Sequence, residues 1–330
     1  MKTENDLYGH FFSEELKKVE LRISKLFKKE HPDSLYEPCS YIIKSGGKRL
    51  RPLLVILCAK AVGGDIKNVY NAAVAVELLH NFTLVHDDIM DNADKRRGRT
   101  TLHKKYDLST AILSGDSLLA FAYVNLLKDT MENDKSVLSS FTKGVVEVCE
   151  GQSLDKEFET NDKVTIDDYL IMIKKKTAAL LEMCCSIGAQ LGGGSVQKQN
   201  ALAKYGRNMG MAFQLQDDLL DIIAEEAEFG KVIGGDLVEG KKTFLFLNAL
   251  EKAKGKDKIL LKSVIKNKGI KKEEVSKFRE LFYKLGVIED TEKEIIRYTK
   301  LALKETKVIE SEIDRNMLVW LASSLIKRNK

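Results

Sequence analysis

Apolar residues recur every three or four positions along almost the whole chain, and this spacing limits the possible folds more than any other feature. Leu16, Val19, Ile23 and Leu26 form one such run. On an α-helix, with about 3.6 residues per turn, residues at these intervals share one face that can be buried. The sequence lacks the sustained apolar–polar alternation and the Asn-Gly or Asp-Gly pairs that mark β-hairpins. It therefore predicts an all-α fold.

Glycines and polar clusters divide this pattern into separate helices. The predicted helices cover residues 11–30, 36–45, 50–62, 67–92, 107–131, 134–151, 166–192, 196–224 and 241–253, and a more polar helical region runs from about 256 to 329. All 3 prolines lie at or before Pro52, and no later segment resembles a linker between domains. We therefore expect a single domain over residues 1–330.

The composition is that of an ordinary globular protein, with 330 residues, 44% hydrophobic content and a formal net charge of +5. A chain of this length folds without disulfides or structural metal. Its 5 cysteines are odd in number and form no metal-binding pattern, so we expect buried, reduced thiols and a cytoplasmic location. The sequence predicts no signal peptide and no membrane span, since no apolar run approaches roughly 18 residues. Charges of both signs alternate, which argues against nucleic-acid binding.

Two acidic clusters with the same D-D-x-x-D spacing interrupt this helical pattern. The first contains Asp87, Asp88 and Asp91, at the C-terminal end of a predicted apolar helix. Since each residue advances an α-helix by about 100°, the three carboxylates share one face within roughly one turn. They repel one another there and oppose the helix dipole, so a compensating cation is expected nearby.

The second cluster repeats the spacing with Asp217, Asp218 and Asp221 on another apolar helix. Carboxylates without histidine or cysteine suit a hard cation, and a small number of protein ligands leaves room for water and phosphate oxygens, which points to Mg²⁺. One such motif alone is more often a solvated acidic helix face, but two copies beside apolar turns favour a metal site. Neither cluster has the alternating carboxylates and glycine of an EF-hand.

Mg²⁺ held by a few carboxylates commonly accompanies a polyphosphate, and the chain contains several cation-rich segments that could bind one. These segments are residues 46–52 (GGKRLRP), 95–98 (KRRG), 174–177 (KKKT), 229–231 (FGK) and 240–243 (GKKT). Each alone would pass for a solvated basic loop, whereas together they predict diphosphate binding. Residues 235–242 resemble a P-loop, but Lys242 stands at the Ser/Thr position and no strand is predicted before it, which excludes an NTPase.

In this order, the motifs between Gly46 and Thr243 resemble those of the trans-prenyl diphosphate synthases. The motifs are G-G-K-R-x-R-P, H-D-D-x-x-D with R-R-G, K-T, F-Q-x-x-D-D-x-x-D and G-K-x-x-G-x-D. The resemblance implies an isoprenoid-synthase-type helical bundle around a deep central cavity, with the two aspartate-rich helices facing each other near its mouth. It also implies a homodimer.

The same resemblance implies roles for individual residues. Asp87, Asp91, Asp217 and Asp221 would bind about three Mg²⁺ ions per active site, with Asp88 and Asp218 in the same acidic rims. The six aspartates and Lys176 would carry the catalysis. The allylic diphosphate (dimethylallyl, geranyl or farnesyl) would be bound through Mg²⁺ and by Arg96, Lys176, Thr177, Gln214, Lys231 and Lys241. Isopentenyl diphosphate would be bound by Lys48, Arg51, His80 and Arg97.

Helix geometry independently supports two of these assignments. His80 precedes Asp87 by seven positions, so it lies on nearly the same face about two turns away. A single histidine on an apolar face is more often a core residue, but here a second anion must lie behind the first, which favours binding. Gln214 likewise shares the face of Asp217 and Asp221.

The implied reaction is an electrophilic alkylation. Departure of the allylic diphosphate leaves a carbocation that the double bond of isopentenyl diphosphate attacks, and the released diphosphate is the plausible base. A terpene cyclase of the same fold needs only one diphosphate site and usually replaces the second aspartate cluster. An inactive regulatory subunit typically loses one cluster. Both clusters are intact here, which disfavours these two alternatives.

Product length is predicted from Phe82 and Thr83, at the fifth and fourth positions before the first cluster. In the family, an aromatic at only the fifth position resembles the geranylgeranyl (C20) type, two aromatics favour farnesyl (C15), and two small residues favour longer chains. We therefore expect C20, with C15 as the runner-up. On an ideal helix Phe82 projects about 140° from Asp87, so it reaches the growing tail only if the helix is distorted or the cavity wraps around it. A core phenylalanine is the alternative.

Overall fold

The structure is a computed structural model, and it describes residues 4–28, 30–130, 135–224 and 234–326. Residue contacts divide the chain into two compact units. Unit 1 comprises Met1–Thr142, Cys184–Leu202 and Ile309–Met317, and unit 2 comprises Lys143–Met183, Ala203–Val308 and Leu318–Lys330. The single domain expected over residues 1–330 remains a prediction.

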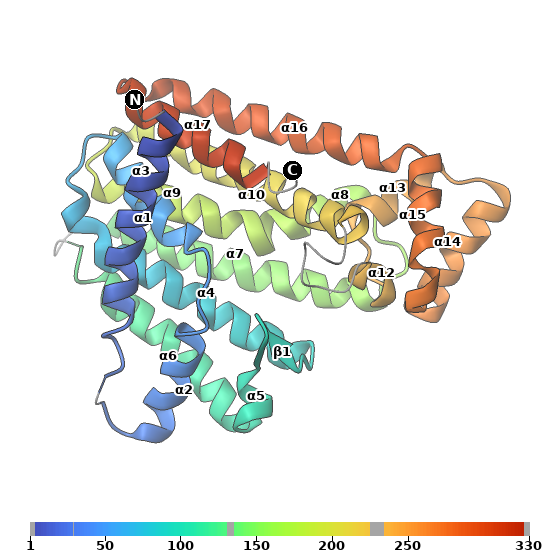
Figure 1. The fold of residues 1–330 in the computed structure, drawn as a ribbon, viewed down its shortest axis with the longest axis horizontal. Coiled ribbons are helices and arrows are strands. Elements are labelled where there is room, and N and C mark those ends of the chain that lie inside the picture. Colours follow the sequence, from blue (N-terminus) through green and yellow to red (C-terminus); the bar gives the residue numbers. More distant parts are fainter. Residues whose placement is uncertain (1–3, 29, 131–134, 225–233, 327–330) are drawn as a thin grey trace. The chain divides into compact units, whose positions relative to one another are not determined.

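The predicted all-α fold is confirmed, because the described residues form helices apart from one short hairpin (Figure 1). The elements up to residue 160 are α1 (Glu4–Ile23), α2 (Asp33–Ile43), α3 (Leu50–Ala61), η1 (Ile66–Val69), α4 (Tyr70–Met90), β1 (Lys95–Arg96), β2 (Arg99–Thr100), α5 (Leu102–Lys105), α6 (Leu108–Leu126) and α7 (Lys135–Thr160). The later elements are α8 (Ile166–Ile173), η2 (Lys174–Ala178), α9 (Ala179–Leu191), α10 (Val196–Ile223), α12 (Gly235–Val238), α13 (Phe244–Lys252), α14 (Gly255–Asn267), η3 (Lys272–Glu274), α15 (Val275–Lys284), α16 (Val287–Glu305), η4 (Thr306–Val308) and α17 (Glu312–Ile326).

In unit 1, α4 packs against α3 and α6 (Figure 1). Most of α4 is buried on every side, including Ala72, Val76 and Leu79. A helix that is apolar all round needs neighbours on several faces, and this explains why the longest apolar stretch of the sequence lies inside the unit. The first acidic cluster is at the C-terminal end of this helix, where the exposed Met90 and Asp91 mark its less buried part.

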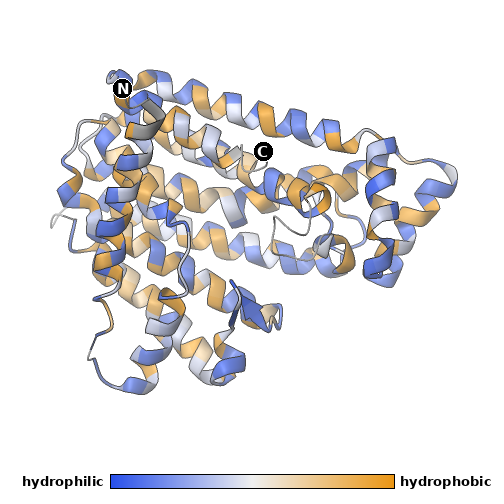
Figure 2. Cartoon of the chain, viewed as in Figure 1, coloured by the Kyte–Doolittle hydropathy of each residue, from blue (hydrophilic) through white to orange (hydrophobic). Residues whose placement is uncertain are grey.

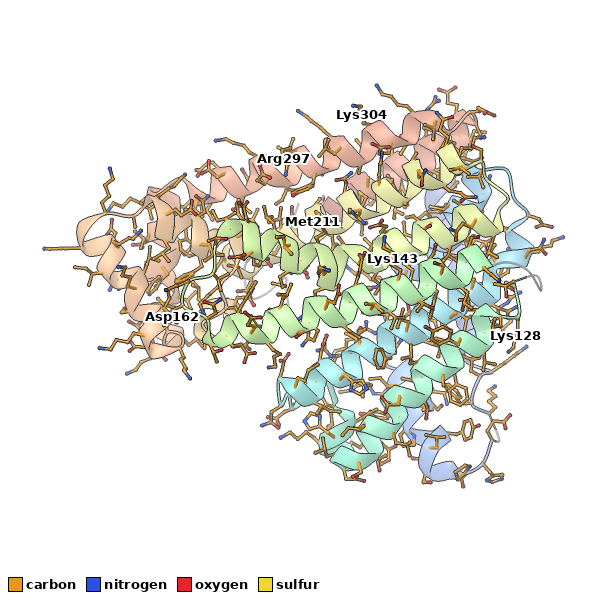
Figure 3. All side chains as sticks on the ribbon, turned by 180° about the vertical axis from the view of Figure 1, so that it is seen from behind. Lys128, Lys143, Asp162, Met211, Arg297 and Lys304 are labelled. Carbon is orange, nitrogen blue, oxygen red and sulfur yellow. The ribbon has the colours of Figure 1, made fainter. Side chains whose placement is uncertain are left out.

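In unit 2, amphipathic helices surround an apolar cluster that contains Phe244, Phe246 and Phe282. The helix α16 shows the pattern clearly, because Ile295 is buried whereas Arg297 is exposed. Figure 2 shows the resulting mixture of hydrophilic and hydrophobic residues along this helix, and Figure 3 labels Arg297 and the exposed Lys304 on it. The polar C-terminal region of the sequence therefore contributes one face of each helix to a core.

The hairpin of β1 and β2 is a feature that the sequence analysis did not anticipate. The two strands pair antiparallel with Arg96 opposite Arg99. Arg97 and Gly98, which connect them, have φ angles of 51° and 75°. Positive φ at both central residues is the geometry of a favoured two-residue hairpin turn. The turn was missed because its first residue is an arginine, a type that rarely adopts such a conformation, in place of asparagine or aspartate.

The predicted helix 11–30 is wrong at both ends, because the structure has α1 at Glu4–Ile23, and two further differences meet at Gly151. The predicted helix 134–151 continues as α7 to Thr160, and the predicted helix 166–192 is interrupted by the π-helical turn η2. A Cβ atom at Gly151 would overlap the backbone nitrogen of Lys176. The glycine therefore allows two backbones to approach closely inside a helix, and it does not end the helix as expected.

The cysteine expectation is confirmed for four residues and wrong for one. Cys39, Cys58, Cys184 and Cys185 are buried and take part in no disulfide among the described residues, whereas Cys149 is exposed on α7 beside the exposed Glu150. Within the described parts of the chain, no helix is both long and apolar enough to cross a membrane.

Candidate active site

The first acidic cluster lies where α4 ends, and a cation compensates its middle aspartate. Asp88 is only 2% exposed, and Arg96 Nε donates a hydrogen bond of 2.6 Å to its Oδ1. The β1–β2 hairpin brings Arg96 back toward the helix end. Burial raises the pKa of Asp88, and the positive charge of Arg96 opposes that rise. The compensating cation expected from the sequence is therefore confirmed for Asp88.

The other two aspartates of this cluster are more accessible than Asp88. Asp87 is half-buried in the last turn, and Asp91 is an exposed residue that caps the helix, with its N–H 2.9 Å from the carbonyl oxygen of Asp87. His86 is turned to other partners, since its ring centroid lies 4.8 Å from that of Phe82 and its Nε2 lies 3.2 Å from Asp116 Oδ1. The donors at this helix end are therefore carboxylate oxygens, which fit Mg²⁺.

The second carboxylate oxygen of Asp88 also bears on whether these donors fit Mg²⁺. Oδ2 of Asp88 is buried and has no hydrogen-bond partner among the described residues, so Arg96 satisfies only one of the two carboxylate oxygens. The described residues contain no group of three or more His, Cys, Asp or Glu side chains arranged to hold a metal. Mg²⁺ commonly uses one or two carboxylates and takes its remaining ligands from phosphate and water, so the donor set is compatible with it.

Several residues expected to bind isopentenyl diphosphate lie close together in unit 1. Burial, followed by the positive charges of Arg51 and Arg97, lowers the pKa of His80 well below its usual range. Nδ1 of His80 has no hydrogen-bond partner among the described residues. Arg97 donates to the carbonyl oxygen of Gly46, and a Cβ at Gly47 would come 2.8 Å from Arg97 Nη1. Lys48, in the same glycine loop, is exposed.

Arg49 has a different role from its neighbours in the GGKRLRP segment. It is buried, and it donates to Glu77 and Glu20 at 2.6 Å each and to the carbonyl oxygen of Ile43 at 2.8 Å. One of the three cations in this segment is therefore committed to internal ion pairs that anchor the start of α3. The sequence carried no signal that distinguished it from Lys48.

The second acidic cluster lies on α10, and neutral donors bind its middle aspartate. Asp218 is 4% exposed. Gln214 Nε2 donates to Asp218 Oδ1 at 2.9 Å, and the hydroxyl of Tyr169, from α8, donates to Oδ2. Thr177, in η2, donates to Gln214 Oε1 at 2.8 Å. The structure thus brings together Thr177, Gln214 and Asp218, which the sequence analysis had named, and adds Tyr169, which it had missed.

The environment of Asp218 favours its neutral form. Burial, with the nearby negative charge of Asp236 as the next cause, raises the pKa of Asp218 to about 8, although the hydrogen bonds from Tyr169 and Gln214 act in the opposite direction. Burial and the negative charge of Asp218 raise the pKa of Tyr169 well above its usual range. Tyr169 therefore remains a hydrogen-bond donor at neutral pH.

The end of α10 is joined to the segment that follows it. The N–H of Asp236 donates to Asp221 Oδ2 at 3.1 Å, and the N–H of Gly234 donates to the carbonyl oxygen of Asp221 at 2.7 Å. Lys241 Nζ lies 2.7 Å from Glu239 and 3.6 Å from Asp236. Burial lowers the pKa of Lys241, but these two acidic groups outweigh it, so the net shift is upward.

Of two further predicted residues near the second cluster, the structure describes Asp217 but not Lys231. Asp217 is half-buried on α10, one residue before Asp218. The predicted residue Lys231 and its neighbours in the segment 229–231 lie outside the described residues.

The π-helical turn η2 carries Lys176 and Thr177. Lys176 Nζ pairs with Asp155 of α7 at 2.5 Å. Gly151 of α7 and Gly210 of α10 both lie against this turn, where a Cβ on either would overlap the backbone of η2. A π-helical turn is uncommon and frequently marks a functional site. Asp155 is a second residue that the sequence analysis missed, because nothing local links it to a lysine 21 positions later.

The two residues expected to limit product length are on α4. Phe82 is half-buried and packs on His86, one turn later on the same helix. A Cβ at Gly115 of α6 would come 2.6 Å from His86 Nε2, so Phe82 and His86 belong to the face of α4 near α6. Thr83 donates its hydroxyl to the carbonyl oxygen of His80 at 2.8 Å.

An all-helical fold with aspartate-rich turns on two long helices defines an isoprenoid-synthase-type protein, and comparisons with known proteins agree. A model of the polyprenyl synthetase family matches residues 32–282. The geranylgeranyl diphosphate synthase of Methanosarcina mazei is 47% identical over 238 residues, which cover 71% of this chain and 73% of that protein. The geranylgeranyl pyrophosphate synthase of Geoglobus acetivorans is 38% identical over 325 residues, which cover 98% and 100%, respectively.

A solved structure is similar over nearly the entire chain. The crystal structure of geranylgeranyl pyrophosphate synthetase from Pyrococcus horikoshii Ot3 has a TM-score of 0.91 and 36% sequence identity, covering 98% of this chain and 99% of that chain. The chain therefore belongs to the polyprenyl synthetase family, the trans-isoprenyl diphosphate synthases, as its motifs predicted.

Proposed function

We propose that this chain is a trans-prenyltransferase that condenses isopentenyl diphosphate with an allylic diphosphate to give geranylgeranyl diphosphate. The observation that carries the proposal is the relatedness, over most of the chain, to proteins named for that product. The allylic substrate is dimethylallyl, geranyl or farnesyl diphosphate. The alternatives of a farnesyl or longer-chain synthase and of a terpene cyclase are not favoured.

The family generally depends on Mg²⁺, and the donor sets fit this ion. In our proposal Asp87, Asp91, Asp217 and Asp221 hold about three ions, which supply positive charge as the allylic diphosphate departs. Asp88 orients Arg96 through the Nε bond, and Asp155 orients Lys176, and we assign to each carboxylate the role of positioning its cation for the allylic diphosphate. A homodimer and a cytoplasmic location remain part of the prediction.

Isopentenyl diphosphate is assigned to the group of residues around His80 in unit 1. Arg51, Arg97 and Lys48 supply positive charge, and His80, whose pKa is lowered, supplies a neutral imidazole that can donate a hydrogen bond to an anion. The carbocation is attacked only if the second substrate is held in near-attack geometry, which is the contribution of these residues. The apolar tail requires surroundings that exclude water.

The direct test incubates the purified protein with isopentenyl diphosphate and each allylic diphosphate, with MgCl₂ or with EDTA, and identifies products by chromatography. The proposal expects mainly C20 product that depends on Mg²⁺ and on both substrates. Diphosphate release from an allylic substrate alone would instead indicate a cyclase. If no combination of substrates releases diphosphate, the alternative of an inactive regulatory subunit is favoured.

The placement of isopentenyl diphosphate is tested with Lys48→Ala and His80→Ala. Each variant should raise the KM for isopentenyl diphosphate by about tenfold, because a charge-assisted hydrogen bond contributes about 1.5–3 kcal/mol. Lys44→Ala, which changes an exposed lysine in the same region, is the matched control. A selective increase in the KM for the allylic substrate would reverse the placement of the two substrates.

The proposed product length is tested with Phe82→Ala. If Phe82 limits the growing chain, the variant should give products longer than C20. Phe121→Ala, which removes another partly buried phenylalanine of unit 1, should leave the product distribution unchanged. An unchanged distribution in Phe82→Ala would mean that this ring only packs against His86.

A further inference from the structure

Four side chains of unit 2 form a continuous series of hydrogen bonds that ends at a predicted substrate-binding hydroxyl. Tyr169 donates to Asp218 Oδ2, Gln214 donates to Asp218 Oδ1 at 2.9 Å, and Thr177 donates to Gln214 Oε1 at 2.8 Å. Three separate elements, α8, α10 and η2, contribute to it. Tyr169 lies at the end of the series farthest from Thr177.

The direction of these bonds follows from the inventory of donors and acceptors. A side-chain amide has one oxygen that accepts and one NH₂ group that donates. Because Asp218 receives the NH₂ group of Gln214, the amide oxygen must face Thr177, as the 2.8 Å bond shows. The orientation of Gln214 therefore depends on Asp218 remaining in place as an acceptor.

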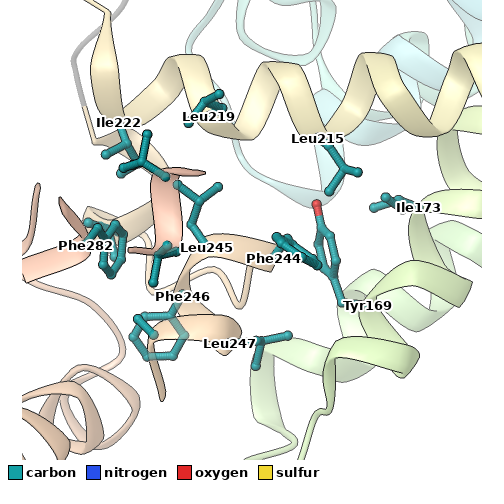
Figure 4. Close-up of a cluster of buried hydrophobic side chains, with 14 of the residues drawn as sticks. Tyr169, Ile173, Leu215, Leu219, Ile222, Phe244, Leu245, Phe246, Leu247 and Phe282 are labelled. Carbon is teal, nitrogen blue, oxygen red and sulfur yellow. The ribbon is translucent and has the colours of Figure 1, made fainter. Parts of the chain in front are cut away.

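The ring of Tyr169 is fixed by packing, but its hydroxyl is not needed for that packing. Tyr169 is buried in the apolar cluster with Ile173, Leu215 and Phe244. Figure 4 shows the hydroxyl pointing from this cluster toward the helix that carries Leu215 and Leu219. A phenylalanine would fill the same space, so the hydroxyl serves Asp218 alone.

We propose that Tyr169 is a positioning residue for the allylic diphosphate: its hydroxyl holds Asp218, which orients Gln214 and through it Thr177. The inference rests on the proposed function and deepens it, because Thr177 and Gln214 are assigned to that substrate. Tyr169 itself does not touch the substrate in this scheme. Removing its hydroxyl leaves one oxygen of a buried carboxylate without its donor, and Asp218 is then free to turn and release Gln214.

The first experiment compares Tyr169→Phe with Tyr205→Phe. Tyr205 is also fully buried in unit 2 and donates to a backbone carbonyl oxygen, that of Leu318, at 2.8 Å. Both variants lose one buried hydrogen bond, so both should lose thermal stability. Only Tyr169→Phe should raise the KM for the allylic diphosphate, by about 3- to 10-fold, with the KM for isopentenyl diphosphate changed less than about twofold. Equal kinetics in the two variants would overturn the proposal.

The second experiment exchanges the donor and the acceptor within the series. Asp218→Asn should impair allylic binding, because the asparagine keeps an acceptor toward Gln214 only if its NH₂ group faces Tyr169, whose hydroxyl must then accept and no longer donates. Adding Gln214→Glu restores a donor–acceptor pair in the reverse direction, keeps an acceptor for Thr177 and keeps one carboxyl group in the series. The double variant should therefore bind better than Asp218→Asn by about tenfold or more. If the effects of Asp218→Asn and Gln214→Glu on allylic binding simply add, Asp218 does not orient Gln214 and the proposal is overturned. This outcome can be measured even if Tyr169→Phe fails to fold.

A binding measurement separates this inference from the proposed function. Calorimetric titration of the full chain with inorganic diphosphate in MgCl₂ reports the site without requiring turnover. If the parent protein binds diphosphate but makes no prenyl product, the proposed function fails while the inference is still tested by the weaker binding of Tyr169→Phe. If the parent makes product and Tyr169→Phe binds diphosphate as tightly as Tyr205→Phe, the inference fails alone.

Discussion

The two acidic clusters share the spacing D-D-x-x-D, but their middle aspartates are compensated in different ways. Asp88, in unit 1, is paired with a cation, Arg96, which follows it by eight positions. Asp218, in unit 2, is held by the neutral donors Tyr169 and Gln214. Both carboxyl groups are buried, and burial raises the pKa of each. Identical spacing on a helix therefore defines a common face without defining a common electrostatic environment.

This difference shows which contacts hold each cluster in place. The first cluster is stabilised locally, by a hairpin that directly follows the helix end. The second depends on a residue 49 positions earlier and on the close approach of η2 to the glycines of α7 and α10. We expect the first cluster to respond mainly to charge and salt, and the second mainly to packing and hydrogen bonding.

The largest effect on turnover should come from replacing the first aspartate of either cluster. Asp87→Ala and Asp217→Ala should each lower kcat by about 100-fold or more, because stabilisation of the departing diphosphate is lost. Asp290→Ala, which removes a carboxylate paired with Lys252 elsewhere in unit 2, is the control. Steady-state kinetics and circular dichroism measure turnover and helical content. Near-normal turnover in either variant would remove that cluster from the active site.

The next largest effect concerns pH and stability in the metal-free protein. The pKa of Asp218 is raised to about 8 in the folded state, whereas an unfolded aspartate titrates near 4, so stability falls as pH rises between these values. Asp218→Asn should remove this loss and raise Tm at pH 9 by roughly 5 °C relative to the parent. Burial also raises the pKa of Asp88, so Asp88→Asn removes a loss of the same sign, but it also takes the carboxylate partner from Arg96 and should therefore raise Tm less or not at all.

Thermal unfolding in EDTA from pH 4 to pH 9 measures both variants. The gain in Tm at pH 9 should be larger for Asp218→Asn than for Asp88→Asn. Equal gains in the two variants would contradict the distinction between cation pairing and neutral donors.

A smaller effect is expected from Gly151→Ala, which tests the packing of η2. The added methyl group would overlap the backbone of Lys176, so the free energy of unfolding should fall by about 1–3 kcal/mol. Gly9→Ala, in open space within α1, should instead raise it by about 0.5–1 kcal/mol. Urea denaturation measures both. A neutral Gly151→Ala would show that η2 can shift without cost.

The smallest effect is the dependence on salt. A double-mutant cycle between Asp88 and Arg96 should show a coupling energy that falls by about 0.5 kcal/mol from low salt to 1 M NaCl, because Arg96 is 32% exposed. The same cycle between Tyr169 and Asp218 should be insensitive to salt, since a neutral donor takes part and both groups are buried. Equal salt dependence of the two couplings would contradict the comparison.

Most of the fold and many of the site residues could be predicted because the relevant signals are local. Helix periodicity is readable within a few turns, which gave the all-α class and the location of Asp87 and Asp217 on helices. Local rules failed at Gly151, where a glycine serves a contact with Lys176, and at Arg97, where a hairpin turn uses an arginine. In both places the conformation depends on what lies opposite, which spacing along the chain does not report.

The sequence by itself determined the helical class, the two aspartate clusters and the polyprenyl synthetase family, since periodicity and motif order are properties of the chain. Only the tertiary structure decided which partner each buried aspartate has. Arg49 and Lys48 are neighbours in one motif, yet one is buried in ion pairs and the other is exposed. Tyr169 and Asp218 are far apart in sequence, yet they share a hydrogen bond. Partner choice depends on which surfaces pack together, because a buried polar group must be satisfied by whatever neighbour the fold brings within reach.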